Sequence, residues 1–162
     1  MSDVLKEKVD LVTGAISHRA TWTGLTYKYG VEAGKAAEME DIIRKAITET
    51  GHLTGEAIKA RIKDPEDFNC FFDEFANPVM RAAFNVVPTE LTDEVLNLEF
   101  TQCPLLNRWR ELGLDDGMCA KLCELAMEGD RNVAKTMGYD FYLGETLAKG
   151  DCKCHIRFSK KK

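Results

Sequence analysis

The closing segment YDFYLGETLAKGDCKCHIRF, residues 139–158, decides the fold because its pattern is that of two strands joined by a turn. Tyr139, Phe141 and Leu143 alternate with other residues, as in a half-buried strand. After a turn at 149–151, every second residue again falls on one face, which carries Cys152, Cys154, Ile156 and Phe158. This segment predicts an antiparallel strand pair with one inward face.

The stretch before it predicts another strand pair and two helices. Leu96, Leu98 and Phe100 alternate with polar residues, and a turn at 88–92 would pair them with a strand that starts near Phe84. Helical spacing follows over residues 105–112 and 118–137, with a glycine-bounded break between them and a possible interruption at Gly129. The second half therefore has the order ββααββ.

The first half has the 3.6-residue period of helices. The pattern predicts one helix from Val4 to Gly30, a second from Lys35 to Gly51, and a short third near residues 54–57. A fourth would start at Asp64 and Pro65, since aspartate caps free amides and proline suits a first turn. Four phenylalanines at 68, 71, 72 and 75 give it an apolar stripe, which is either core or an interface with another chain.

These elements predict an α+β fold in which a helical half, about residues 1–77, packs on an antiparallel sheet in residues 78–162. The 162 residues, 44% hydrophobic and 30% charged, suit one globular domain spanning 1–162. A net charge of −5 argues against a nucleic-acid partner. The amino terminus has no signal or membrane-spanning pattern, so we expect a cytoplasmic protein without a membrane partner.

Five of the six cysteines fall in the last third of the chain, which predicts a thiol-rich site. Cys103 opens a helix, where backbone amides favour a thiolate. Cys119 and Cys123 lie one helical turn apart, and Cys152 and Cys154 alternate on a strand. Three interpretations stay open: a nucleophile at Cys103 or Cys123, a zinc site of Cys119, Cys123, Cys152 and Cys154, or thiols that are only buried.

A second group combines a titratable ring, a cation and aromatic surface on the first helix. His18, Arg19, Trp22 and Tyr27 could hold a small carboxylate. The alternative is that Trp22 packs in the core while His18 and Arg19 are solvated. Near Cys123, Glu124 and Asp130 are candidate bases.

Four stretches together resemble one known family: HRATWTGLTYKYG, CPLL, CAKLCELA and YLGETLAKGDCKCHIRF. This is the L-2-amino-thiazoline-4-carboxylic acid hydrolase family. The resemblance implies hydrolytic opening of a cyclic amino-thiazoline carboxylate to a carbamoyl-cysteine. A hydrolase of this kind would act on a non-peptide carbon–nitrogen bond of a small-molecule carboxylate.

The resemblance also suggests roles for the candidate residues. Cys103 or Cys123 would attack the substrate while Glu124 or Asp130 moves protons, or zinc held by cysteines would activate water. Arg19 would bind the carboxylate, with Trp22 and Tyr27 lining the pocket. The alternative is a noncatalytic module that binds zinc or a small ligand, related to vinyl-reductase-like domains, or a subunit of a homo-oligomer.

Overall fold

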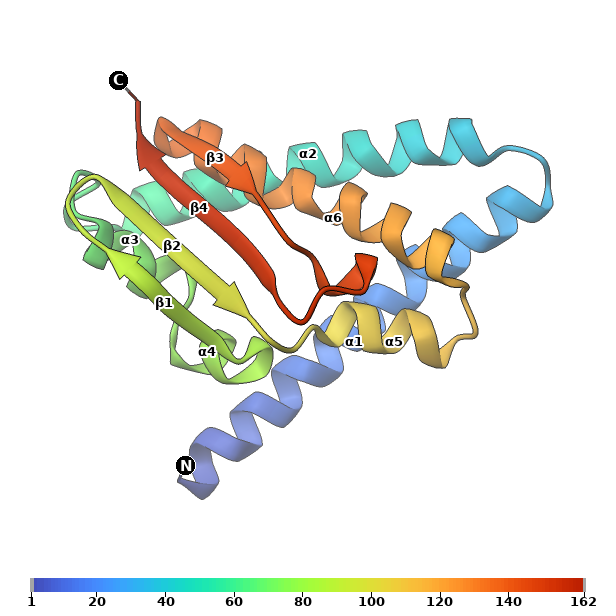
Figure 1. Ribbon diagram of the computed structural model, residues 1–162, viewed down its shortest axis with the longest axis horizontal. Coiled ribbons are helices and arrows are strands. Elements are labelled where there is room, and N and C mark those ends of the chain that lie inside the picture. The colour runs from blue at the N-terminus through green and yellow to red at the C-terminus, as the bar shows by residue number, and fades with distance from the viewer. Residues whose placement is uncertain (1, 162) are drawn as a thin grey trace.

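The structure, a computed structural model that describes residues 2–161, has the α+β architecture that the sequence predicts (Figure 1). Over these described residues, six α-helices, four strands and one short 3₁₀ helix follow one another. In order they are α1 (Asp3–Glu32), α2 (Ala36–Arg61), α3 (Phe68–Phe75), α4 (Pro78–Phe84), β1 (Val86–Leu91), β2 (Val95–Phe100), α5 (Pro104–Glu111), α6 (Asp116–Met137), β3 (Tyr139–Leu143), η1 (Leu147–Lys149) and β4 (Cys154–Lys160). The ββααββ order of the second half is confirmed.

The four strands form one antiparallel sheet in the order β1-β2-β4-β3. In the central pair, Leu96 lies opposite Phe158 and Leu98 opposite Ile156, and all four are buried. They meet side chains of α2, α3 and α6, which cover this face of the sheet. Because successive side chains of a strand point to opposite sides of the sheet, the buried side chains all lie on one face of it.

The phenylalanine stripe of α3 belongs to this core. Phe68, Phe71 and Phe72 are buried, and the ring centroids of Phe71 and Phe158 lie 5.0 Å apart. The interpretation of this stripe as a surface for another chain is therefore wrong.

A second core lies between α1, α2, α5, α6 and η1. At its centre the indole of Trp109 is buried and donates a hydrogen bond to the carbonyl oxygen of Ala20 at 3.0 Å. In Figure 1, α2 and α6 run side by side, and the amino-terminal end of α1 projects beyond the rest of the molecule. Within residues 2–161 no helix combines the length and apolar character needed to cross a bilayer.

The predicted end of the second helix at Gly51 is wrong, because α2 continues to Arg61 and absorbs the short third helix. Gly51 serves another purpose: a Cβ atom there would lie 2.5 Å from the carbonyl oxygen of Gly129 on α6. The glycine allows two helix backbones to approach, and α6 likewise continues through Gly129. At Gly30 too, α1 continues and ends only at Glu32.

We expected a strand to start near Phe84, but this residue is the last of helix α4 and the strand starts at Val86. Asn77 caps it by accepting hydrogen bonds from the amides of Val79 and Met80, both at 3.1 Å, and Pro78 occupies its first turn. The predicted start of the preceding helix also moves, because Asp67 rather than Asp64 caps α3. Three helices, not four, therefore precede Asn77.

The predicted turn at residues 88–92 is shifted as well. Pro88 lies within β1, an edge strand where a missing amide costs little, and the chain turns after Thr92.

Candidate functional site

Four residues of α1 were expected to bind the carboxylate of a ligand, but they do not surround a common cavity. His18, Arg19 and Trp22 are exposed, and the Trp22 indole donates to the His18 ring at 3.2 Å. The alternative that Trp22 packs in the core is wrong, since 70% of its surface is exposed. Tyr27 is buried and its hydroxyl donates to Glu40 at 3.0 Å. Burial and Glu40 raise the pKa of Tyr27 to about 12, so it remains a neutral hydrogen-bond donor.

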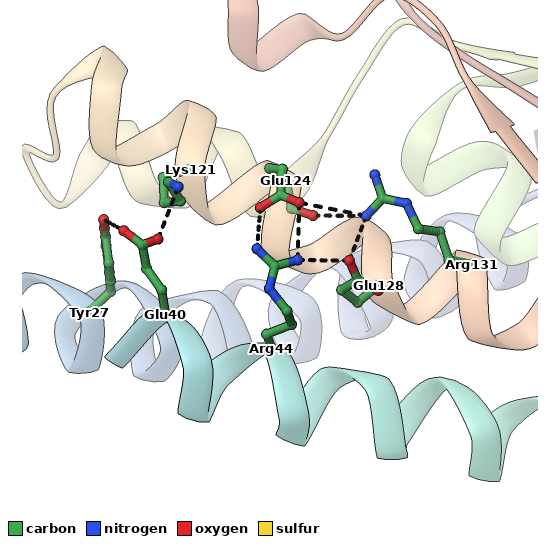
Figure 2. Close-up of polar contacts among 7 residues, drawn as sticks. All are labelled: Tyr27, Glu40, Arg44, Lys121, Glu124, Glu128 and Arg131. Atoms are coloured by element: carbon green, nitrogen blue, oxygen red, sulfur yellow. Dashed lines mark hydrogen bonds and ion pairs between the residues drawn. The ribbon is translucent and has the colours of Figure 1, made fainter. Parts of the chain in front are cut away.

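Glu124, one of the two candidate bases, lies in an ionic network between α2 and α6 (Figure 2). Arg44 approaches both of its carboxylate oxygens, at 2.8 and 3.1 Å, and also binds Glu128 at 2.7 Å. Arg131 binds Glu128 at 2.9 Å from the other side. The Arg44 guanidinium lowers the pKa of Glu124, which makes this carboxylate a poor proton acceptor.

We expect Glu124→Gln to lower the free energy of unfolding by about 0.5–1 kcal/mol at pH 7, since the Arg44 pair is about one-third exposed. A lowered folded-state pKa stabilises the protein above the unfolded value of 4.5, and this contribution is lost as the pH falls through the folded value. The difference between the two proteins should therefore vanish in acid. Urea unfolding at pH 7 and pH 3 measures it. Asp41→Asn, which breaks the more exposed pair with Lys45, should cost less.

Three of the predicted cysteines converge from three elements. Cys103 is at the N-cap position of α5 without a capping side-chain hydrogen bond, Cys123 lies on α6, and Cys154 is the first residue of β4. The backbone amide of Leu147 in η1 donates to Cys154 Sγ at 3.3 Å, and the Leu147 side chain lines a surface depression together with Cys103. Cys103, Cys123 and Leu147 all pack against the second core.

Burial raises the pKa of all three thiols, and they also influence one another electrostatically. The pKa of Cys123 rises to about 12, first through burial and then through the charges of Cys154, Cys103 and Asp130. Cys103 does lie at a helix start, where the amides of Leu105 and Leu106 favour a thiolate, but burial outweighs them. The helix amides thus act in the expected direction, but burial is the larger effect and the pKa of Cys103 is raised overall.

Cys119 and Cys152 are placed differently. Cys119 is fully buried in the second core, where its Sγ donates to the Leu114 carbonyl at 3.7 Å, whereas Cys152 is exposed before β4 begins. Across residues 2–161, no three histidine, cysteine, aspartate or glutamate side chains are arranged to hold a metal ion. The residues present thus do not fit the predicted zinc ligand set of Cys119, Cys123, Cys152 and Cys154.

Asp130, the second candidate base, is a carboxyl group that acts on all three thiols of the cluster, whereas Asp151 acts on Cys154. Dense surroundings raise its pKa from 3.8 to about 6, although Arg19 and Arg131 act in the opposite direction and part of its surface reaches solvent. Its charge acts on Cys103, Cys123 and Cys154. A carboxyl group with a pKa near 6 can both accept and donate a proton close to neutral pH.

Polar residues that were not predicted from the sequence surround the depression beside Cys103. This hollow has a volume of about 430 Å³, and Gln102, Asn107 and Arg110 contribute to its lining. Cys103, Asn107 and Arg110 are spaced four and then three residues apart, which puts them on one face of α5. That spacing is the signal that could have identified them.

Comparisons with known proteins agree with this architecture. The model of the L-2-amino-thiazoline-4-carboxylic acid hydrolase family matches residues 14–158. No match was found among curated proteins.

A similar solved structure is trafficking protein particle complex subunit 3 from Naegleria fowleri, covalently bound to palmitic acid. It has a TM-score of 0.60 and 12% identity over 91% of this chain and 96% of that chain, so it shows a shared fold alone. The family match covers most of the sequence, including α5, α6 and the first five residues of β4. The chain belongs to the L-2-amino-thiazoline-4-carboxylic acid hydrolase family.

Proposed function

We propose that this protein is a hydrolase that opens a cyclic carbon–nitrogen bond in a small amino-thiazoline-type carboxylate. The observation that carries the proposal is the convergence of three thiols with Asp130 beside an open depression. Family membership supplies the reaction class. The cluster supplies a nucleophile and a proton carrier.

Cys103 is the best candidate for the nucleophile because it lines the depression that a substrate can enter. Asp130 is the best candidate for the proton carrier, since Glu124 is held by Arg44 while the pKa of Asp130 lies near 6. Ionised Asp130 would first take the proton of the Cys103 thiol. This step compensates for the raised pKa of the thiol, because the thiolate is formed only for reaction.

In the proposed reaction the Cys103 thiolate adds to the ring carbon that carries two nitrogens and one sulfur. The bond from this carbon to the ring nitrogen then breaks, and the ring nitrogen leaves as an amine that takes one proton from Asp130 and one from the exocyclic amino group, which becomes an imine. Water attacks the remaining enzyme-bound carbon, returns one proton to the imine nitrogen, gives the other to the Asp130 carboxylate and displaces the Cys103 thiolate. One water is consumed, and the product is a carbamoyl-cysteine.

The test is turnover of 2-amino-thiazoline-4-carboxylate by purified protein, followed by liquid chromatography with mass detection. We expect Cys103→Ala to reduce turnover to background, while Cys152→Ala, which changes an exposed thiol outside the cluster, retains it. Cys123→Ala and Cys154→Ala test the two supporting thiols. Wild-type turnover in all three cluster variants would refute the thiol mechanism.

A noncatalytic ligand-binding module is the second candidate, and the raised pKa values of the three thiols favour it. A neutral thiol cluster can line a binding site without reacting. Calorimetric binding of the thiazoline carboxylate with no product formed would support this candidate. Product formation that depends on Cys103 would eliminate it.

A further inference from the structure

We propose that Arg110 binds the carboxylate group of the ligand in the depression beside Cys103. The inference rests on the proposed function for the identity of the substrate, but its core claim is simpler. A small carboxylate occupies this hollow, with its charged end at Arg110 and its other end at Cys103. Arg19, which the sequence suggested for this role, lies outside the hollow.

The position of Arg110 supports this role. Arg110 and Cys103 line the same hollow from the same helix, seven residues apart, so their Cα atoms are separated by about 10 Å. The charge of Arg110 acts on Cys119 of α6. Because long side chains on a helix lean back toward its amino terminus, we expect the guanidinium to reach along the hollow in the direction of Cys103 when a ligand binds. The volume of the hollow, about 430 Å³, can hold a small ring with a carboxylate on one side and a reactive carbon on the other.

Arg110 is also available for a ligand. Over residues 2–161 its side chain makes no ion pair or hydrogen bond, and it is exposed. Its neighbour Arg108 differs, because it donates to Thr21 at 2.8 Å and pairs with Glu111 at 3.1 Å. Two arginines of one short helix thus have different roles: Arg108 ties α5 to α1, while Arg110 lines the hollow.

The other lining groups fit the same ligand. A guanidinium binds a carboxylate through two parallel hydrogen bonds, and the amides of Gln102 and Asn107 can add further donors. Leu106 and Leu147 give the hollow an apolar side that suits a ring.

The test compares two alkylating reagents that differ in charge. Iodoacetate and iodoacetamide both react with a thiolate and release iodide, but only iodoacetate carries a carboxylate. We expect Arg110→Gln to slow the reaction of Cys103 with iodoacetate about 5- to 10-fold relative to iodoacetamide, as for the loss of one charged hydrogen bond. Mass spectrometry of Cys103-containing peptides gives both rates. Their ratio cancels any change in the pKa of Cys103.

Three controls make the result specific. Cys152 in the same protein is exposed and should show an unchanged ratio. Lys59→Gln removes one exposed positive charge from α2 and should leave the ratio at Cys103 unchanged. A ratio that falls in Arg19→Gln but not in Arg110→Gln would overturn the inference and return the role to Arg19, and an equal fall at Cys152 would overturn it as a general charge effect.

The inference and the proposed function can fail separately. If the wild type shows no turnover but Arg110→Gln changes the reagent ratio, the hydrolase proposal fails and the carboxylate site stands. If the wild type turns over the thiazoline and Arg110→Gln changes neither KM nor the reagent ratio, the carboxylate site fails and the hydrolase stands.

Discussion

An asparagine in place of Asp130 should make the protein more stable at pH 8 and nearly inactive. Dense surroundings disfavour the ionised carboxylate and raise its pKa to about 6, so the native state is destabilised whenever this group is charged. The neutral amide of asparagine avoids that penalty. It cannot carry a proton between Cys103 and the leaving amine, so we expect kcat/KM to fall by roughly 10²–10⁴-fold.

The sign of the pH effect follows from proton binding. Asp130 has a pKa of about 6 in the folded protein and 3.8 in the unfolded chain, so the folded state binds more protons between these values. Stability therefore falls as the pH rises from about 4 to about 6. Two pKa units correspond to a total on the order of 2–3 kcal/mol. Asp130→Asn should remove this decline, so its advantage over the wild type appears across the same window.

Urea unfolding at pH 4, 6 and 8 measures the stability change, and the thiazoline assay measures the rate. Asp140→Asn, at an exposed carboxylate on β3, is the matched control and should change neither. Lower stability of Asp130→Asn at pH 8 would contradict the expected penalty. Full activity would show that Asp130 is not the proton carrier.

The class of the fold was predictable because each strand and most helices carry their pattern locally. Leu96 and Leu98, like Ile156 and Phe158, alternate with polar residues, and the two pairs meet across β2 and β4. The local sequence pattern could not predict the role of Gly51 in helix packing. A glycine after a helical run resembles a helix end, yet here it marks a contact with α6, which lies far away in the sequence.

The candidate site was predictable only in part. Cys103, Cys123, Cys154 and Asp130 come together, and the sequence had selected all four. Cys119 shares a helix face with Cys123 but is directed into the core, because spacing along one helix does not specify what packs against it. The ion pair of Glu124 could not be predicted either, since its partner Arg44 belongs to a different helix.

Gly51→Ala should be among the most damaging small substitutions in this protein. The added Cβ would lie 2.5 Å from the Gly129 carbonyl oxygen and 2.9 Å from both the Gly129 Cα and the Asn132 Cβ. Two of these three atoms are backbone, so no side-chain rotation relieves the clash and α2 must move away from α6. We expect a loss of about 2–3 kcal/mol in the free energy of unfolding, at the upper end for overpacking.

Gly14→Ala is the matched control, because it makes the same substitution inside helix α1 where a Cβ would meet no atom within 4 Å. There alanine restricts the unfolded chain and favours the helix, so stability should rise by about 0.5–1 kcal/mol. Urea unfolding of both variants separates the two effects of one methyl group. Equal changes in the two variants would mean that helix propensity governs both positions. A fall at Gly51 with a rise at Gly14 would mean that the distance between α2 and α6 depends on this missing side chain.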